Sequence, residues 1–204
     1  HFEEYREDVR LKLVKCGCTQ VDVVLAHLRN PSFETLLTYH SVMVWSNANF
    51  HAAEALGDVL ADAADEGVGV VICCYSMKEA DEGVGISGRI VSYLPCTFGY
   101  VQGGEELTLQ PNTKQLQEWP KTAPIMEGVE KLSGGPESMH LSIEKKIGVF
   151  SAVTVANWSN RVPAVVVNLA AGKRQAAVVV WNCRPGSSAV SQHGWVESGH
   201  GMRL

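Results

Sequence analysis

Apolar residues recur at helical spacing in the first third of the chain. In residues 51–65 they fall at positions 53, 56, 60 and 64, which share one face of a helix. In residues 3–15 acidic residues crowd the first turn and lysines come late, the charge order that a helix dipole favours. A short helix is expected from Pro31 through Leu37, because proline is tolerated at a helix start. The pattern therefore predicts three helices in this part of the chain.

Three short runs between these helices have the composition of β-strands. Residues 21–26 are β-branched, whereas residues 40–46 and 69–75 are almost continuously apolar. A continuous apolar run is typical of a strand with both faces covered, as in a parallel sheet between helices. Strands that alternate with helices in this way predict right-handed β–α–β units.

The last third of the chain has strands that follow one another directly. Residues 146–159 and 161–183 are predicted as strands, and within the second, 164–169 and 176–182 form the arms of a hairpin. A last helix is expected in the tail after Pro185.

Together these elements predict one domain over residues 1–204. Its fold is expected to be α/β, with a mainly parallel central sheet and an antiparallel C-terminal hairpin at the edge. The sequence opens on His1 rather than methionine, so we expect it to be a fragment of a longer chain.

Ligands of such sheets bind where the parallel strands end, and this rule selects three candidate stretches. They are His27 after the first predicted strand, then Trp45, Ser46 and Asn47 after the second, and Cys74, Tyr75 and Ser76 after the third. Asn47 has a second interpretation, as the N-cap of the helix over 51–65, a role that Asn49 could also fill.

Cys74 is the candidate nucleophile of this set. A reactive thiolate would need a base, His27 or His193, or the dipole of a helix that starts near Ser76. The other interpretation is a buried strand cysteine, since a reduced cysteine in an apolar run behaves as a small hydrophobe. The sequence favours the buried cysteine and leaves the nucleophile as the alternative.

The segment from Gly83 to Gly88 matches the G-x-G-x-x-G pattern of dinucleotide-binding loops. That function needs a strand directly before the first glycine, whereas Lys78 to Glu82 is polar and acidic. Acidic side chains repel a pyrophosphate, so we expect a glycine loop with no nucleotide.

Composition and charge narrow the class of protein. The chain has a net charge of −5 without a long basic run, which argues against a nucleic-acid or anionic-membrane surface. No run of 18 apolar residues is present, so no membrane span is expected. The six cysteines lack the spacing of a zinc framework, which favours a reducing, intracellular and cytoplasmic location.

Two further groups have structural interpretations. Asp58, Asp62 and Asp65 lie off the apolar stripe of their helix and are expected to form a solvated face rather than a metal site. Three tryptophans, at 158, 181 and 195, are expected to fill core rather than to stack on a ligand. The sequence predicts no metal and no cofactor.

Four stretches, taken in their order along the chain, resemble one superfamily. They are PSFETLLTYHSVMVWSN (31–47), ALGDVLADAADEGVGVVI (55–72), TAPIMEGVEKL (122–132) and WSNRVPAVVVNLAAGKRQAAVVVWN (158–182). In this order they are similar to the class I glutamine amidotransferase-like superfamily, in its ThuA-like (trehalose-utilisation) branch. The resemblance implies a flavodoxin-like three-layer sandwich. It also implies an opening strand before the first helix, which lies upstream of this sequence or is lacking.

The catalytic signature of the active amidotransferases is absent from the matching positions. Their nucleophile lies in G-x-C-x-G, but no glycine flanks Cys74 here. The family also has a His-x-Glu motif near its end, but His193 is followed by Gly194 and Trp195 here. Ala123 stands where the family has the histidine of His-Pro-Ile.

We therefore expect a non-catalytic binding or assembly module of an intracellular protein, with an unknown protein or a small molecule as its partner. The alternative is a cysteine-dependent hydrolase or amide-processing enzyme. It would use Cys74 with a histidine base, and Tyr75 or backbone N–H groups as oxyanion donors.

Overall fold

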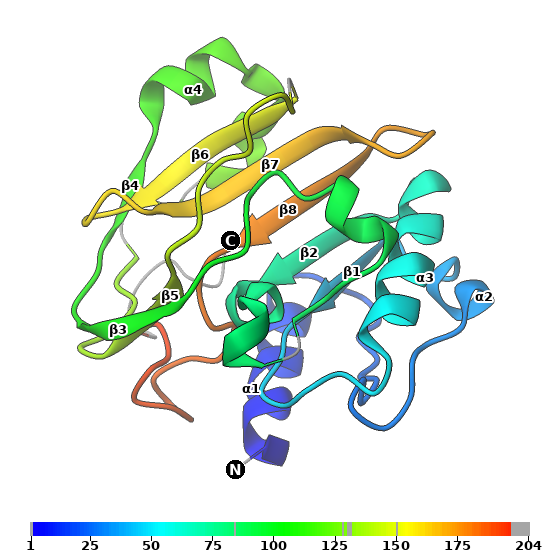
Figure 1. Ribbon diagram of the computed structural model, residues 1–204. Helices are drawn as coiled ribbons and strands as arrows, with labels where there is room; N and C mark the ends of the chain where they lie inside the picture. The colour runs from blue at the N-terminus through cyan, green and yellow to red at the C-terminus, as the bar shows by residue number, and fades with distance from the viewer. Residues whose placement is uncertain (1, 84, 128, 130–131, 150, 197–204) are drawn as a thin grey trace.

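A six-stranded sheet forms the centre of the computed structural model, which describes residues 2–83, 85–127, 129, 132–149 and 151–196 (Figure 1). The strands lie in the order β1-β2-β8-β7-β6-β4. Their bounds are Ser41–Val44 (β1), Gly69–Cys73 (β2), Leu109–Pro111 (β4), Ala152–Trp158 (β6), Pro163–Ala171 (β7) and Ala176–Trp181 (β8). A two-stranded sheet pairs β3 (Val101–Glu105) with β5 (Ser138–Leu141). The α/β class is thereby confirmed.

The balance of parallel and antiparallel pairing differs from the prediction. Only β1 with β2 and β2 with β8 are parallel, and the three remaining pairs are antiparallel. The predicted hairpin is present as β7 and β8, but it lies inside the sheet and not at its edge. The reason is that β8 pairs with the parallel strand β2 on one side and with β7 on the other. Beyond β7, β6 and then β4 extend the sheet.

The described residues also form four α-helices and four 3₁₀ turns. The helices are α1 (Phe2–Lys15), α2 (Phe33–Leu36), α3 (Ala53–Asp65) and α4 (Thr113–Glu118). The 3₁₀ turns are η1 (Cys74–Met77), η2 (Ala80–Glu82), η3 (Arg89–Ser92) and η4 (Pro120–Met126). The helices predicted from the first third of the chain are confirmed. The predicted tail helix is wrong as far as residue 196, where the chain makes turns and bends because its hydrogen bonds go to α1 and to Ser133.

Residues 21–26 contradict the sequence prediction most directly, because they belong to no strand. The composition of the segment suits a strand, but a strand also needs a hydrogen-bonded neighbour. In the part of the chain that the structure describes, no backbone hydrogen bond joins residues 21–25 to β1.

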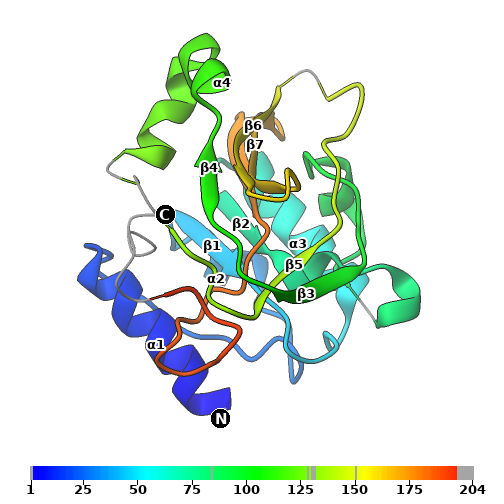
Figure 2. The same cartoon turned by 90° about the vertical axis from the view of Figure 1, so that its left-hand side faces the viewer.

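The sheet has a hydrophobic core on each face, which explains the continuously apolar strands. Val178 and Val180 of β8 lie in the core that includes α3, whereas Val179 packs against the opposite core with Trp158 and Trp195. Trp158, Trp181 and Trp195 are all buried, as predicted. Figure 2 shows α1 and α3 on opposite sides of β1 and β2, so this part of the molecule has three layers.

The glycine-rich segment packs along α3. A Cβ at Gly57 would lie 1.6 Å from the carbonyl oxygen of Ser87, so only glycine permits this approach of loop to helix. The element directly before the segment is η2 rather than a strand, and the element after it is η3. The expectation of a glycine loop is supported by this geometry.

The acidic face of α3 contacts this loop, and one of its three aspartates, Asp65, is buried there. Asp65 is 4% exposed and accepts hydrogen bonds from Tyr93 Oη (2.8 Å) and Arg89 Nη2 (2.9 Å), while Asp58 Oδ1 accepts from the Arg89 N–H. The Tyr93 hydrogen bond is the main cause that lowers the pKa of Asp65, with the Arg89 and Lys173 bonds adding to it. The prediction of a solvated face was therefore wrong for Asp65, because the loop supplies partners that the helix pattern does not reveal.

Candidate functional site

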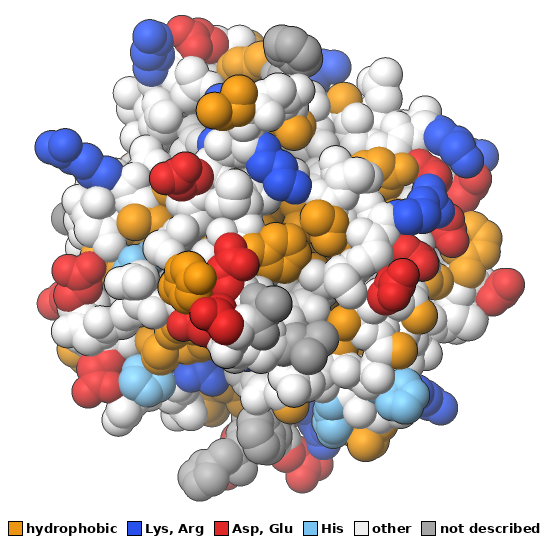
Figure 3. All heavy atoms as spheres, viewed as in Figure 1, with side chains coloured by type: hydrophobic (Ala, Val, Ile, Leu, Met, Phe, Trp, Pro, Cys, Tyr) orange, Lys and Arg blue, Asp and Glu red, His pale blue; other side chains and the backbone are white. Residues whose placement is uncertain are grey.

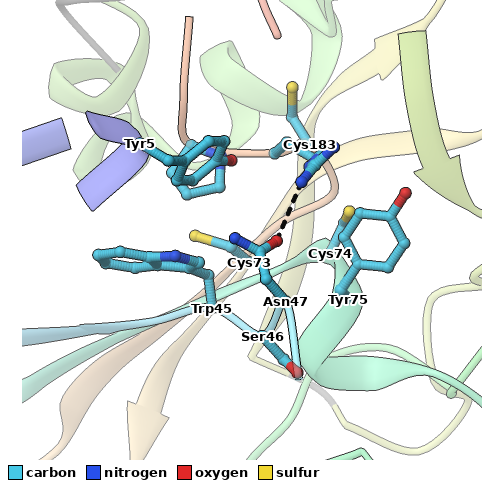
Figure 4. Close-up of a pocket in the computed structure, with 10 residues that line it drawn as sticks. Tyr5, Trp45, Ser46, Asn47, Cys73, Cys74, Tyr75 and Cys183 are labelled. Carbon is cyan, nitrogen blue, oxygen red and sulfur yellow. Dashed lines mark hydrogen bonds between the residues drawn. The ribbon is translucent and has the colours of Figure 1, made fainter. Parts of the chain in front are cut away.

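The carboxyl ends of β1, β2 and β8 meet at a small recess (Figure 4). Each strand continues into polar or sulfur-containing residues at this edge, and α1 adds Tyr5 from outside the sheet. The lining residues are Tyr5, Trp45, Ser46, Asn47, Cys73, Cys74, Tyr75, Cys183, Arg184 and Pro185. This is where parallel sheets place their ligands.

Arg184 occupies the middle of the recess. Its guanidinium carbon lies 5.2 Å from the ring centroid of Tyr5 and 5.3 Å from that of Tyr75, within the range of a cation–π interaction. Its Nη2 also donates to Asn47 Oδ1 at 3.0 Å, the dashed line in Figure 4. The packed side chains leave no space in the recess for a water molecule.

Tyr5 fixes α1 against this end of the sheet. The side chain is 5% exposed, and its hydroxyl oxygen accepts a hydrogen bond from the Gly186 N–H at 2.9 Å. Burial raises the pKa of Tyr5 above its ordinary value. A Cβ at Gly186 would lie 2.3 Å from a ring carbon of Tyr5, so the ring packs directly on this glycine.

Cys74 lies at the start of η1, directly after β2, and is 1% exposed. Burial raises the pKa of the Cys74 thiol well above its ordinary value, and neighbouring Cys183 and Cys73 raise it further. The thiol points toward the Met139 carbonyl oxygen at 4.0 Å, and no histidine is among the residues that line the recess. The thiol is therefore protonated at neutral pH, and its surroundings lack the base that a nucleophile needs.

Five of the residues selected from the sequence come together at the recess: Trp45, Ser46, Asn47, Cys74 and Tyr75. Burial, followed by the effect of Cys74, raises the pKa of Tyr75 to about 12, and its hydroxyl donates to Met139 Sδ at 2.8 Å. This phenol is therefore neutral at physiological pH.

The structure places the remaining candidates elsewhere. Ser76 is fully buried, with its hydroxyl 3.4 Å from the Val44 carbonyl oxygen. His27 is exposed and lines a separate groove beside β1. His193 lies in the C-terminal tail, where its Nδ1 is 3.4 Å from a carboxylate oxygen of Glu137.

Neither asparagine that was considered as a helix cap fills that role. The N-cap of α3 is Ala52, which makes no side-chain capping hydrogen bond. Asn47 instead accepts from Arg184.

Sequence reasoning missed Tyr5, Cys183 and Arg184. The strand-end rule could have found Cys183 and Arg184, because they follow the end of β8 as closely as Ser46 and Asn47 follow the end of β1. Tyr5 carries no such signal, since it lies in a helix and reaches the recess only through the packing of α1.

Among the described residues, no group of three or more histidine, cysteine, aspartate or glutamate side chains could hold a metal ion. None of the helices in that same part of the chain combines the length and the apolar character needed to cross a bilayer. On the face drawn in Figure 3, acidic and basic side chains are interspersed.

Comparisons with known proteins support the fold and assign no family or function. No protein-family model matches the chain, and no curated protein matches it. A β-galactosidase from Rahnella sp. R3 has a similar structure, with a TM-score of 0.56 and 15% identity over 90% of this chain. A ThuA-like protein from Bacteroides uniformis matches 85% of this chain and 69% of its own, with a TM-score of 0.55 and 10% identity. The chain spans only 25% of the length of the β-galactosidase.

Proposed function

We propose that the chain is a non-catalytic binding or assembly module of a longer intracellular protein. In this proposal its fold is flavodoxin-like and related to the ThuA-like branch of the class I glutamine amidotransferase-like superfamily. The observation that carries the proposal is the state of the recess. The edge where parallel sheets bind ligands is filled by Arg184, clamped between Tyr5 and Tyr75.

The buried thiol supports the same proposal. A cysteine nucleophile needs a depressed pKa and access to substrate. Cys74 has a raised pKa and 1% exposure instead. The resemblance implies a nucleophile near the position of Cys74, but the burial and the raised pKa of this thiol favour a structural cysteine.

The structural neighbours are compatible with a modular role. The fold makes up a quarter of the β-galactosidase and about two thirds of the ThuA-like protein, so it occurs as a part of larger chains. At these identities the likeness concerns the fold alone, and the reactions of those proteins are not assigned to this one.

The decisive experiment follows alkylation of each cysteine by mass spectrometry while the pH rises from about 5 to about 9. Cys18, which is exposed, serves as the internal reference. Cys74 should react at least about 1,000-fold more slowly than Cys18, because its modification requires opening of a structure with several kcal/mol of stability.

The opposite result would be rapid, selective modification of Cys74 with a midpoint well below the roughly 8.5 of a free thiol. It would establish an activated thiolate, and the cysteine-dependent hydrolase would replace the binding module. Cys74→Ser serves as the matched control, since it must abolish any turnover that belongs to this thiol.

A further inference from the structure

A histidine is enclosed where the two-stranded sheet meets the six-stranded one. His140 of β5 is 2% exposed, and its Nε2 lies 3.1 Å from the side-chain nitrogen of Asn160, in the turn between β6 and β7. The same nitrogen of Asn160 donates to a carboxylate oxygen of Glu105 in β3, also at 3.1 Å. One amide group therefore stands between an imidazole and a carboxylate.

Contacts on both of its polar atoms fix the orientation of the Asn160 amide. Its oxygen accepts a hydrogen bond from the Val162 N–H at 3.1 Å, and its nitrogen donates to Glu105. A flipped amide would turn its oxygen toward the carboxylate and its nitrogen toward an N–H group, so both contacts would become repulsive. The Asn160 nitrogen is therefore the donor toward His140, and the imidazole Nε2 accepts.

This hydrogen bond defines the protonation state of His140. An imidazole that accepts at Nε2 is neutral and carries its proton on Nδ1. Nδ1 is buried and has no hydrogen-bond partner among the described residues. Burial is the main cause that lowers the pKa of His140, and the Glu105 carboxylate opposes it. Gln102, opposite His140 on β3, is uncharged, as are Met139 and Leu141 beside it in β5.

A second proton on His140 would disrupt the contact with Asn160. The proton would enter at Nε2, so an N–H group would face the N–H groups of the amide. The enclosed imidazolium would then lack an acceptor on either nitrogen, which is unfavourable for a buried charge. The Glu105 carboxylate lies on the other side of Asn160, and withdrawal of the amide would let the two charged groups pair.

The part of the turn that carries Asn160 is free to move. Asn160 and Arg161 are exposed, and Arg161 has a φ of 72°, a left-handed conformation that is unfavourable for a residue other than glycine. Ser159 is anchored by its N–H, which donates to the Thr108 carbonyl oxygen at 2.9 Å. A movement would therefore be confined to the tip of the turn.

β5 is held in place by a different side chain. The amide of Asn182 accepts from the Leu141 N–H and donates to the Leu141 carbonyl oxygen, both at 2.7 Å. Neither bond involves a titratable group, so the strand stays attached at any pH at which the protein is folded. Protonation would act on the turn and not on the strand.

We propose that His140, Asn160 and Glu105 form an acid-sensitive switch. In one state neutral His140 accepts from Asn160, and the turn is joined to β3 and β5. In the other state His140 has taken a proton from solvent at Nε2 and pairs with Glu105, and Asn160 has withdrawn together with Arg161. The switch is independent of what the recess binds.

The direction of the pH dependence follows from burial. The pKa of His140 is lower in the folded protein than its ordinary value of 6.5, so the unfolded chain binds this proton more readily. The contact with Asn160 is therefore complete above pH 6.5 and is lost as the pH falls through the lowered pKa. The stability that the neutral state contributes falls over the same range.

The first test uses the unaltered protein. Imidazole nitrogen shifts in NMR spectra should show the Nδ1–H form of His140 at pH about 7.5 and a titration midpoint below about 6.5. Amide exchange of Val162, corrected for its intrinsic rate, should be at least about 10-fold faster on the acid side of that midpoint, because its acceptor on Asn160 is gone.

Two variants and a control separate the switch from general acid effects. His140→Gln can accept from Asn160 but binds no proton, so Val162 exchange should no longer respond to pH. Asn160→Asp places a carboxylate against the imidazole, so the midpoint should rise by about 1 pH unit. His40→Gln, which removes an exposed histidine, should respond like the parent.

Three outcomes would overturn the proposal. The first is an Nε2–H form of His140 at neutral pH, which would mean that Asn160 does not donate to it. The second is a midpoint at or above 6.5 in the parent protein. The third is a response of Val162 that persists in His140→Gln. If His140→Gln does not fold, the first two measurements on the unaltered protein decide.

Discussion

The recess and the groove share the wall formed by Tyr5, Trp45, Ser46 and Asn47, yet one is filled and the other is open. The recess holds the guanidinium of Arg184 and has no space for water. The groove has a volume of about 790 Å³ and lies between the edge strand β1 and residues 21–26, which belong to no strand. The recess at the carboxyl ends of the strands is therefore closed, whereas the groove beside the edge strand β1 is open.

The difference between the two sites is one of packing, and substitutions that remove or add atoms should reveal it. In a filled site, both kinds of change cost stability, since the atoms there are already in contact. In an open site, neither kind should matter much.

Tyr5→Ala should have the largest effect. It removes a ring that is 5% exposed and supports both Arg184 and Gly186, so unfolding should become easier by about 3 kcal/mol. Denaturant unfolding at constant slope measures the change. Tyr5→Phe keeps the ring and loses only the bond from Gly186, so it should cost about 1 kcal/mol. Equal costs for the two variants would show that the ring is not packed.

Gly186→Ala should follow, with a loss of about 1–3 kcal/mol, because the added methyl group would lie 2.3 Å from a ring carbon of Tyr5. The same substitution in the Tyr5→Ala background should cost much less, since the obstructing ring is gone. Additive losses in this double-mutant cycle would contradict direct contact between the two residues.

Arg184→Ala should cost about 1–2 kcal/mol, through the lost stacking on Tyr5 and Tyr75 and the lost hydrogen bond to Asn47. It should also open the recess and speed alkylation of Cys74. Arg184→Lys keeps the charge but lacks the planar fork, so it should recover only part of the loss. Unchanged protection of Cys74 in Arg184→Ala would mean that Arg184 does not close the recess.

Val24→Ile should have the smallest effect, within about 0.5 kcal/mol of the parent. The side chain is 42% exposed beside the groove, so an additional methyl group meets open space. The same denaturant titration compares it directly with Gly186→Ala, which adds one methyl group to the filled site. A loss as large as that of Gly186→Ala would show that the groove is closed in solution.

Several elements of the fold follow from signals that are local in the sequence. Apolar spacing predicted α3, the continuous apolar runs predicted β1 and β2, and two such runs around a turn predicted the β7–β8 hairpin. The strand-end rule also selected five of the residues that line the recess. These successes share a cause, because periodicity and turn chemistry act between residues that are close in the chain.

Which segments meet depends on long-range packing, which the local pattern does not contain. The β7–β8 hairpin lies inside the sheet, and residues 21–26 belong to no strand. Arg184 lies between two tyrosines from distant elements. Asp65, expected at the surface, is buried and accepts hydrogen bonds from Arg89 and Tyr93 of the loop over α3. Strand pairing, burial and the pKa of a thiol all depend on neighbours remote in sequence, and no local pattern encodes those neighbours.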